Sequence, residues 1–333
     1  MPLFVHAGMP KCGSSGIQGH LSSSEFRKKS SAQIEYLAIT KTADIVCGKY
    51  LVEQAQKTPF RYISSVNQNV IEGFSDSQCK KIADEINTYL KEKKTVILSS
   101  EGWGPRPSST SDIDRIFTRL MEPANLVFYV RPQVEWFNSA WWQWGAWTDR
   151  PLSTWVAQNE VRAEWGRVIA KWEEKDWVKK VIPRLMGSDV VSDFLKVVGF
   201  PEESNHKSNI SMPGSMLRFM QIHRDLRPDP HSPQIEFILS RYIDLPTEET
   251  PWVLPITMVR KLLLRYRDDN LLLSQYLDEE QNERFFSDMR WWAEAQYLEK
   301  KRESPEPQKP SYEELEELLL RSIEGLKRVA YGK

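Results

Sequence analysis

The chain has 333 residues, and its 45 basic and 46 acidic side chains give a net charge of −1 at pH 7. With 40% hydrophobic and 27% charged residues, its composition is typical of a globular protein of one large domain or two modest ones. The near-zero charge gives no overall field that would attract nucleic acid. Because no apolar run reaches the roughly 18 residues of a membrane-spanning helix, we expect neither a nucleic-acid partner nor a membrane span.

The cysteines and the amino terminus bear on the cellular compartment. Cys12, Cys47 and Cys79 are odd in number, and no pair has the spacing of metal ligands. This predicts no disulfide framework and a reducing compartment. A predicted strand begins at Leu3, which leaves no room for a signal peptide, so we expect a cytoplasmic protein. The oligomeric state stays open, a homo-oligomer included.

Residues 3–7, LFVHA, form a short apolar run that predicts a buried strand. A turn of small residues follows, and a helical pattern starts at Ser14 and Ser15. A strand, a small-residue loop and a helix start bind anions, because loop amides and the helix dipole act at one point. Lys11 adds a full charge, and the two serines add neutral donors. A simple turn with a solvated Lys11 would have the same letters.

A second apolar run, residues 125–130, ends at Arg131 and leads into another helical pattern. Ser139 follows Arg131 by 139 − 131 = 8 residues. An arginine fork binds phosphate through two parallel hydrogen bonds, and two helical turns bring the serine hydroxyl back toward the same anion. Taken singly, each residue would be interpreted as a solvated surface side chain.

Together, the PKCGSS loop at residues 10–15 and the Arg131–Ser139 pair resemble the sulfotransferases that use 3′-phosphoadenosine 5′-phosphosulfate (PAPS). In the nucleotide-binding P-loop, by contrast, the lysine stands just before the helix. The resemblance implies an α/β fold with three layers, a P-loop-like parallel sheet flanked by helices, and a helical C-terminal part. It also implies donor binding by Lys11, Cys12, Gly13, Ser14, Ser15, Gly16, Arg131 and Ser139.

Further apolar runs at residues 36–40, 95–100 and 181–185 predict additional strands between helices. Alternating strands and helices favour a parallel sheet, in which ligands bind at the carboxyl ends of the strands. Lys11, Glu101 and Arg131 each lie just past such an end. We therefore expect these three residues to converge on one cleft.

The acceptor hydroxyl of a sulfuryl transfer needs a base within hydrogen-bond reach. In the resembled family the base is a histidine or a glutamate, and Glu101 holds the matching position after the strand that precedes the Arg131 strand. A structural ion pair of Glu101 with Lys11 or Arg131 is the alternative. His6 is the second candidate, although a histidine within a packed sheet is more often structural. We expect no metal site.

The segment around Lys207 and Ser208 is open to two interpretations. Either residue could be a further donor ligand, as a loop at this point of the resembled family implies. Capping of the next helix by Ser211 explains the same letters.

The later sequence is mostly helical. Ser75 with Gln78 and Ser311 with Glu314 predict helix caps, and residues 152–177 predict one long helix. A further helix is expected at 255–267, and residues 267–270 lead from it into a leucine-rich turn. We assign residues 1–302 to the sulfotransferase-like domain, with a helical subregion at about 212–302. Residues 303–333 form a proline-broken linker and a final helix that suits a partner or the surface.

Five tryptophans lie between residues 134 and 147: Trp136, Trp141, Trp142, Trp144 and Trp147. So many tryptophans on one helix could form an aromatic platform for a sugar ring. Packing in the core is the favoured interpretation, and we expect one or two of these side chains to face the acceptor.

The resulting hypothesis is an enzyme that moves a sulfuryl group from PAPS to a hydroxyl of a carbohydrate or glycolipid by in-line displacement, with a carboxylate as the base. A P-loop kinase and a non-catalytic glycan-binding protein on the same fold are the alternatives.

Overall fold

The computed structural model describes residues 2–30, 32–92, 94–105, 111–200, 212–230, 234–245 and 250–331. The chain forms two compact units that interleave along the sequence. Unit 1 comprises Met1–Arg131, Glu164–Ser208 and Arg267–Asp288, and unit 2 comprises Pro132–Ala163, Asn209–Tyr266 and Met289–Lys333. The predicted domain boundary at residue 302 stays a prediction.

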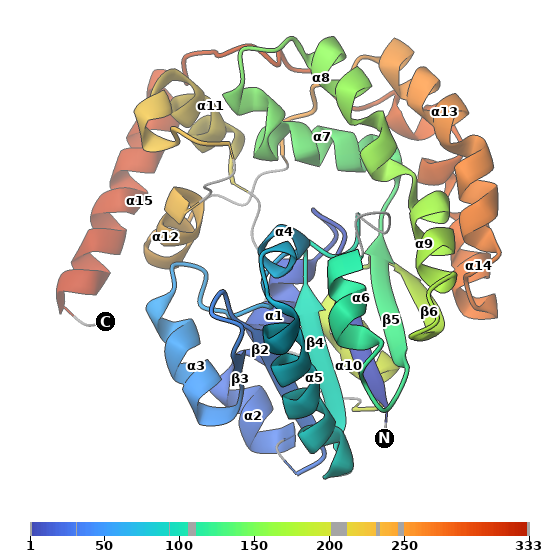
Figure 1. The fold of residues 1–333 in the computed structure, drawn as a ribbon. Coiled ribbons are helices and arrows are strands. Elements are labelled where there is room, and N and C mark those ends of the chain that lie inside the picture. Colours follow the sequence, from blue (N-terminus) through green and yellow to red (C-terminus); the bar gives the residue numbers. More distant parts are fainter. Residues whose placement is uncertain are drawn as a thin grey trace. The chain divides into compact units, whose positions relative to one another are not determined.

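Unit 1 is an α/β unit built on a six-stranded, mostly parallel sheet with the strand order β3-β2-β4-β1-β5-β6 (Figure 1). Only the β2–β3 pair is antiparallel among the described strands. Its strands are β1 (Leu3–Ala7), β2 (Ile34–Ile39), β3 (Ile45–Val46), β4 (Thr95–Ser100), β5 (Ala124–Val130) and β6 (Val178–Leu185). Its helices are α1 (Ser14–Leu21), α2 (Ser24–Ser30), α3 (Gly48–Lys57), α4 (Gln68–Glu72), α5 (Asp76–Lys91), α6 (Ser111–Phe117), α9 (Trp165–Glu173), α10 (Val190–Val197) and α14 (Glu279–Ser287).

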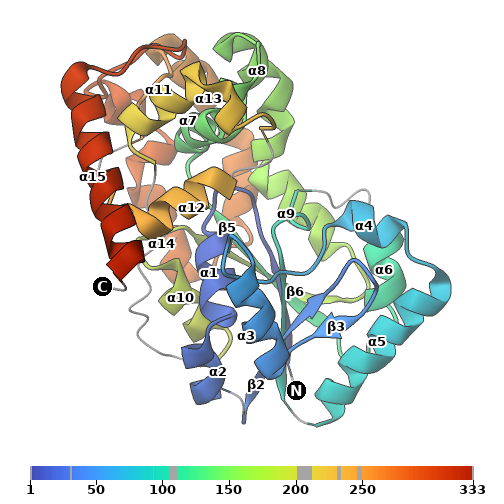
Figure 2. The same cartoon turned by 90° about the vertical axis from the view of Figure 1, so that its left-hand side faces the viewer.

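Helices cover both faces of this sheet. Figure 2 shows α1, α2 and α10 on one side and α5 and α6 on the other. Every residue of β1 and β4 is buried, which agrees with their mostly apolar sequences and the absence of an alternating polar pattern. The α/β class and the parallel sheet predicted from the sequence are therefore confirmed.

The register brings the carboxyl ends of three strands together. Ala7 of β1 lies opposite Ser100 of β4, and His6 lies opposite Val127 of β5. The Gly8 N–H extends the ladder by one bond, 3.0 Å to the Ser100 carbonyl. The residues that follow β1 and β4 therefore start out side by side.

Unit 2 is helical in its described part. Its elements are α7 (Gln133–Gln143), η2 (Gly145–Trp147), α8 (Leu152–Asn159), η3 (Glu160–Ala163), α11 (Gly214–Ile222), η4 (Arg224–Leu226), α12 (Gln234–Tyr242), η5 (Met289–Trp291), η6 (Glu294–Tyr297) and α15 (Tyr312–Tyr331). Helix α13 (Ile256–Ser274) begins in unit 2 and ends in unit 1.

Two predictions about helices are wrong. The expected long helix at 152–177 is broken, and a new helix, α9, starts at Trp165. The carboxylate of Asp269 accepts the N–H groups of Gly166 and Arg167 at 3.0 and 2.9 Å, which stabilises this new start. Asp269 itself lies inside α13, which continues to Ser274 through the stretch where the helix was expected to end in a leucine-rich turn.

The two predicted capping boxes are present. Ser75 and Gln78 exchange hydrogen bonds at the start of α5, and Ser311 and Glu314 do so at the start of α15. Among the described helices, none is both long and apolar enough to cross a membrane.

Candidate active site

The loop after β1 passes through left-handed backbone conformations at two positions, Lys11 (φ 61°) and Gly13 (φ 91°). Such a conformation is uncommon for a lysine, so the surrounding loop must hold it. One hydrogen bond within the loop that helps to hold it joins the Cys12 N–H to the Met9 carbonyl at 3.2 Å. Gly13 is the N-cap of α1, and no described side chain caps this helix start. The first amides of α1 thus keep their capacity to bind an anion.

The two loop serines make long hydrogen bonds to their surroundings. Ser14 Oγ donates to the Met9 carbonyl at 3.5 Å, and Ser15 Oγ lies 3.5 Å from the Tyr62 hydroxyl. Burial raises the pKa of Tyr62 to about 12, opposed by the Ser15 hydrogen bond and aided by the charge of Glu101. Tyr62, from the segment between α3 and α4, therefore lies close to both the loop and Glu101.

The remaining loop residues mainly pack. Cys12 is fully buried. Burial raises the pKa of its thiol to about 12, so the thiol is neutral and not a reactive group. Gly13 and Gly16 face α10: a Cβ on Gly13 would lie 3.0 Å from Val190 Cγ1, and one on Gly16 would lie 3.7 Å from Val191 Cγ2.

Arg131 follows β5 and reaches the same loop. Its Nη1 donates to the Lys11 carbonyl at 3.5 Å. Its own carbonyl accepts a 2.9 Å hydrogen bond from Trp165 Nε1, which holds the end of β5 against the start of α9. The arginine side chain is half-buried.

Glu101 follows β4 and is half-buried. Burial raises its pKa above the ordinary value, and the nearby positive charge of Lys11 lowers it in part. Within the described residues its carboxylate makes no hydrogen bond. A carboxylate with a raised pKa is a stronger proton acceptor than an ordinary glutamate, as a general base requires.

His6 lies inside the sheet and is fully buried. Its Nδ1 lies 2.8 Å from Ser99 Oγ, to which Gln18 Nε2 donates at 3.0 Å. Burial lowers the pKa of His6 to about 3, so the ring is neutral. The imidazole ring packs edge-on against the rings of Tyr129 and Phe194, with ring centroids 6.1 and 5.6 Å away.

Three charged residues that follow strands β1, β4 and β5 lie near the loop after β1. The thiol of Cys12 registers all of them: besides burial, Arg131 and Lys11 act to lower its pKa and Glu101 acts to raise it. The charges of Lys11, Glu101 and Arg131 therefore all lie close enough to Cys12 to act on its thiol.

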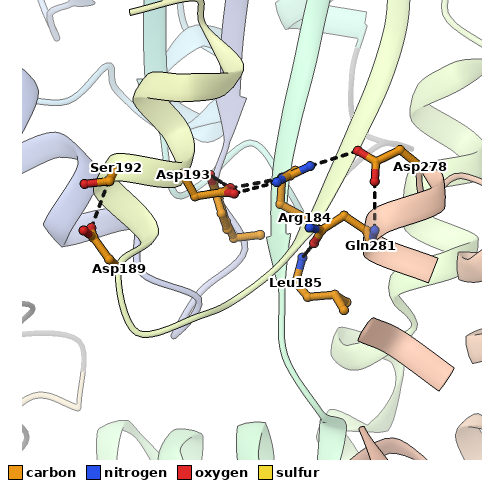
Figure 3. Close-up of polar contacts among 8 residues, drawn as sticks. Arg184, Leu185, Asp189, Ser192, Asp193, Asp278 and Gln281 are labelled. Carbon is orange, nitrogen blue, oxygen red and sulfur yellow. Dashed lines mark hydrogen bonds and ion pairs between the residues drawn. The ribbon is translucent and has the colours of Figure 1, made fainter. Parts of the chain in front are cut away.

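An ion network fastens α10, the helix that supports the loop (Figure 3). Arg184 of β6 donates to Asp193 of α10 at 2.5 and 3.0 Å and to Asp278 at 2.9 Å. The Tyr129 hydroxyl on β5 donates to the same Asp193 at 2.6 Å. Tyr129 stands two residues before Arg131 on the same strand. The network therefore links β5, which leads to Arg131, with α10, which packs against the loop after β1.

The structure does not relate three predicted ligands to this cluster. Ser139 is half-buried on α7, which belongs to unit 2. Lys207 and Ser208 lie outside the described residues. Their assignment to the site stays a prediction.

The sequence interpretation missed Tyr62 and Trp165. Tyr62 stands in a polar stretch without a clear pattern, where nothing in the sequence linked it to Ser15, 47 residues away. Trp165 had the appearance of a core position within a long helix, and only the break before α9 reveals its bond to Arg131.

No family model, curated protein or solved structure matches this chain. Among the described residues, no group of three or more His, Cys, Asp or Glu side chains could hold a metal ion.

Proposed function

We propose that this chain is a PAPS-dependent sulfotransferase that transfers a sulfuryl group to a hydroxyl acceptor. The observation that carries the proposal is the gathering of Lys11, Glu101 and Arg131 around the loop after β1. Two positive side chains beside an uncapped helix start suit a donor with two anionic groups, a 5′-phosphosulfate and a 3′-phosphate, and one carboxylate suits the removal of a proton.

The order of the strands supports the same location. From β1 the chain proceeds toward β2 on one side, and from β5 it proceeds to β6 on the other. In open α/β sheets, ligands bind outside the carboxyl ends of the strands where the connections diverge in this way. Lys11 and Arg131 follow the two strands at this switch point, β1 and β5. A P-loop-like fold is part of the proposal.

Donor binding is assigned from the residues present. The amides of the loop at Gly13, Ser14 and Ser15, together with Lys11, would hold the 5′-phosphosulfate. The guanidinium of Arg131 would hold the 3′-phosphate, with Ser139 as its partner on the ground of sequence spacing. Cys12 and Gly16 would shape the loop, because they are packed against their neighbours.

The proposed reaction is an in-line displacement. The acceptor oxygen forms a bond to sulfur while the bond from sulfur to the 5′-phosphate oxygen breaks. The hydroxyl proton passes to the Glu101 carboxylate, and the ammonium of Lys11 stabilises the charge that develops on the leaving phosphate. Catalysis of this kind depends on position and charge, as in phosphoryl transfer.

Glu101 is preferred to His6 as the base. A base must reach the acceptor, and His6 is sealed within the sheet and bonded to Ser99. Burial also makes its ring a weak base, whereas burial makes Glu101 a stronger one.

A carbohydrate or glycolipid acceptor rests on the sequence resemblance alone. Four of the five tryptophans between residues 134 and 147 are buried, which leaves Trp144 as the half-buried one. They give the acceptor assignment no further support.

The test is calorimetric titration with 3′-phosphoadenosine 5′-phosphate, the product nucleotide, without magnesium. We expect wild type to bind at about micromolar Kd or tighter, and Arg131→Ala to bind about 100-fold more weakly, because a charged fork to phosphate is lost. Arg119→Ala is the matched control, since Arg119 pairs with Asp76 at the surface.

Two results would overturn the proposal. Binding of ATP with magnesium and none of the product nucleotide would favour the kinase. Binding of the nucleotide without sulfuryl transfer to any hydroxyl in a carbohydrate, phenol and lipid panel would favour a non-catalytic protein.

A further inference from the structure

Helix α15 is attached to unit 2 along one face. Leu318 is buried, and Gly325 approaches the Tyr242 carbonyl of α12 so closely that a Cβ would collide with it. Arg321 Nη1 donates to the Asp244 carbonyl at 2.6 Å. These contacts fix the rotation of α15 about its own axis, and so decide which residues face outward.

The outward side of α15 carries an apolar stripe. Its members recur at intervals of three or four residues, the spacing of one face of a helix. We call this set the free face: Tyr312, Leu315, Leu319, Ile323 and Leu326, all exposed. Leu319 is 61% and Leu326 69% exposed. A row of this length on one helix is characteristic of an interaction surface, whereas single exposed leucines are ordinary.

The charges of α15 are divided between its two halves. Residues 312–320 contain four glutamates and no basic residue, and residues 321–331 contain three basic residues and one glutamate. The division agrees with the helix dipole, which accounts for the charges but not for the apolar stripe. A second α15 lying antiparallel would place acidic half against basic half, whereas a parallel one would align like charges.

We propose that the free face of α15 docks antiparallel on the free face of a second copy of this chain, forming a dimer with two-fold symmetry. Such an interface is self-complementary, so each patch meets its own copy. A register centred near Arg321 sets Leu319 opposite the second copy's Ile323. The same register brings Glu316 beside the second copy's Lys327, and it does so twice because of the symmetry.

The composition of the stripe's flanks favours this occupant over a membrane surface. Amphipathic helices that lie on anionic membranes carry basic residues along their polar face. The first half of α15 is acidic instead. One helix from each copy offers a small interface, so we expect a Kd of about micromolar order.

The first experiment is sedimentation equilibrium of the full chain over a concentration range on either side of that value. We expect a shift from 38.9 kDa toward twice that mass. Leu319→Glu should abolish the shift. Leu264→Glu is the matched control, since Leu264 is 68% exposed on α13, away from the stripe. A monomer at every concentration, or equal behaviour of the two variants, would overturn the proposal.

A charge exchange tests the antiparallel orientation. Glu316→Lys alone and Lys327→Glu alone should each weaken the dimer about tenfold, since each creates two repulsive contacts. The double variant should restore the wild-type Kd. Glu324→Lys and Arg328→Glu, which point away from the stripe at 3.6 residues per turn, are the controls. A double variant without recovery would overturn the antiparallel arrangement, and circular dichroism of each variant checks that α15 stays folded.

Discussion

The strand ends of unit 1 and helix α7 of unit 2 both contain many residues of the kinds that bind ligands in other proteins. In α7 these side chains are engaged in hydrogen bonds within the fold, whereas some polar groups at the strand ends are not. In α7, Trp142 Nε1 donates to the Pro251 carbonyl at 2.7 Å, and Asn138 binds the backbone of residues 251 and 253. At the strand ends, Glu101 makes no hydrogen bond within the described residues, and the start of α1 is uncapped. The comparison teaches that a cluster is a candidate site when the fold leaves its polar groups available.

Glu101→Gln is the sharpest test of the unit 1 side. We expect kcat to fall about 1000-fold, because the general base is lost while the shape is kept. Product-nucleotide affinity should change less than about threefold. Steady-state kinetics and calorimetry on the same preparation measure both. A kcat close to wild type would remove Glu101 from the proposed mechanism.

The pH profile of kcat provides a second test of Glu101. The base must be ionised, so activity should fall as pH drops through the raised pKa of Glu101, above the usual glutamate range of about 4.3. An acid limb near pH 3 would point to His6 instead. The folded state holds the Glu101 proton to higher pH than the unfolded chain, so its ionisation lowers stability as pH rises. The Gln variant should therefore melt no lower than wild type at neutral pH.

Trp142→Phe tests the other side of the comparison. Loss of the indole leaves the Pro251 carbonyl without this donor and opens a small cavity, so we expect unfolding to become easier by about 1–3 kcal/mol. Thermal denaturation measures this effect. Product-nucleotide affinity should stay within about threefold of wild type, and a large loss with an unchanged melting temperature would assign α7 a role in binding.

Tyr62→Phe should have the smallest effect. Its hydroxyl lies 3.5 Å from Ser15 Oγ, a long hydrogen bond, so we expect a loss of about 0.5–1 kcal/mol in donor affinity. Calorimetry against the product nucleotide is sensitive enough to resolve it. The phenyl ring keeps the packing, so the melting temperature should not change. An effect as large as that of Arg131→Ala would make Tyr62 a principal ligand.

The amino-acid sequence was enough to predict the five strands of the parallel sheet and the polar residues that follow them, but not the short antiparallel strand β3. Buried parallel strands such as β1 and β4 have mostly apolar sequences, and the residues that follow them, Lys11 and Glu101 among them, lie at the carboxyl edge of the sheet. The capping boxes of α5 and α15 were equally readable, because each depends on residues three apart.

Tertiary structure alone decided what each polar group meets. Asp269 breaks a helical pattern about 100 residues away by capping α9, and Tyr62 reaches Ser15 from an unpatterned stretch. Burial disfavours the charged form of both His6 and Glu101. It therefore lowers the pKa of His6, which makes the ring a weak base, and raises the pKa of Glu101, which makes the carboxylate a stronger one. The close approach of Gly325 to α12 likewise decides which side of α15 faces outward and forms the free face. Local patterns cannot contain these contacts, because they join residues distant in the chain.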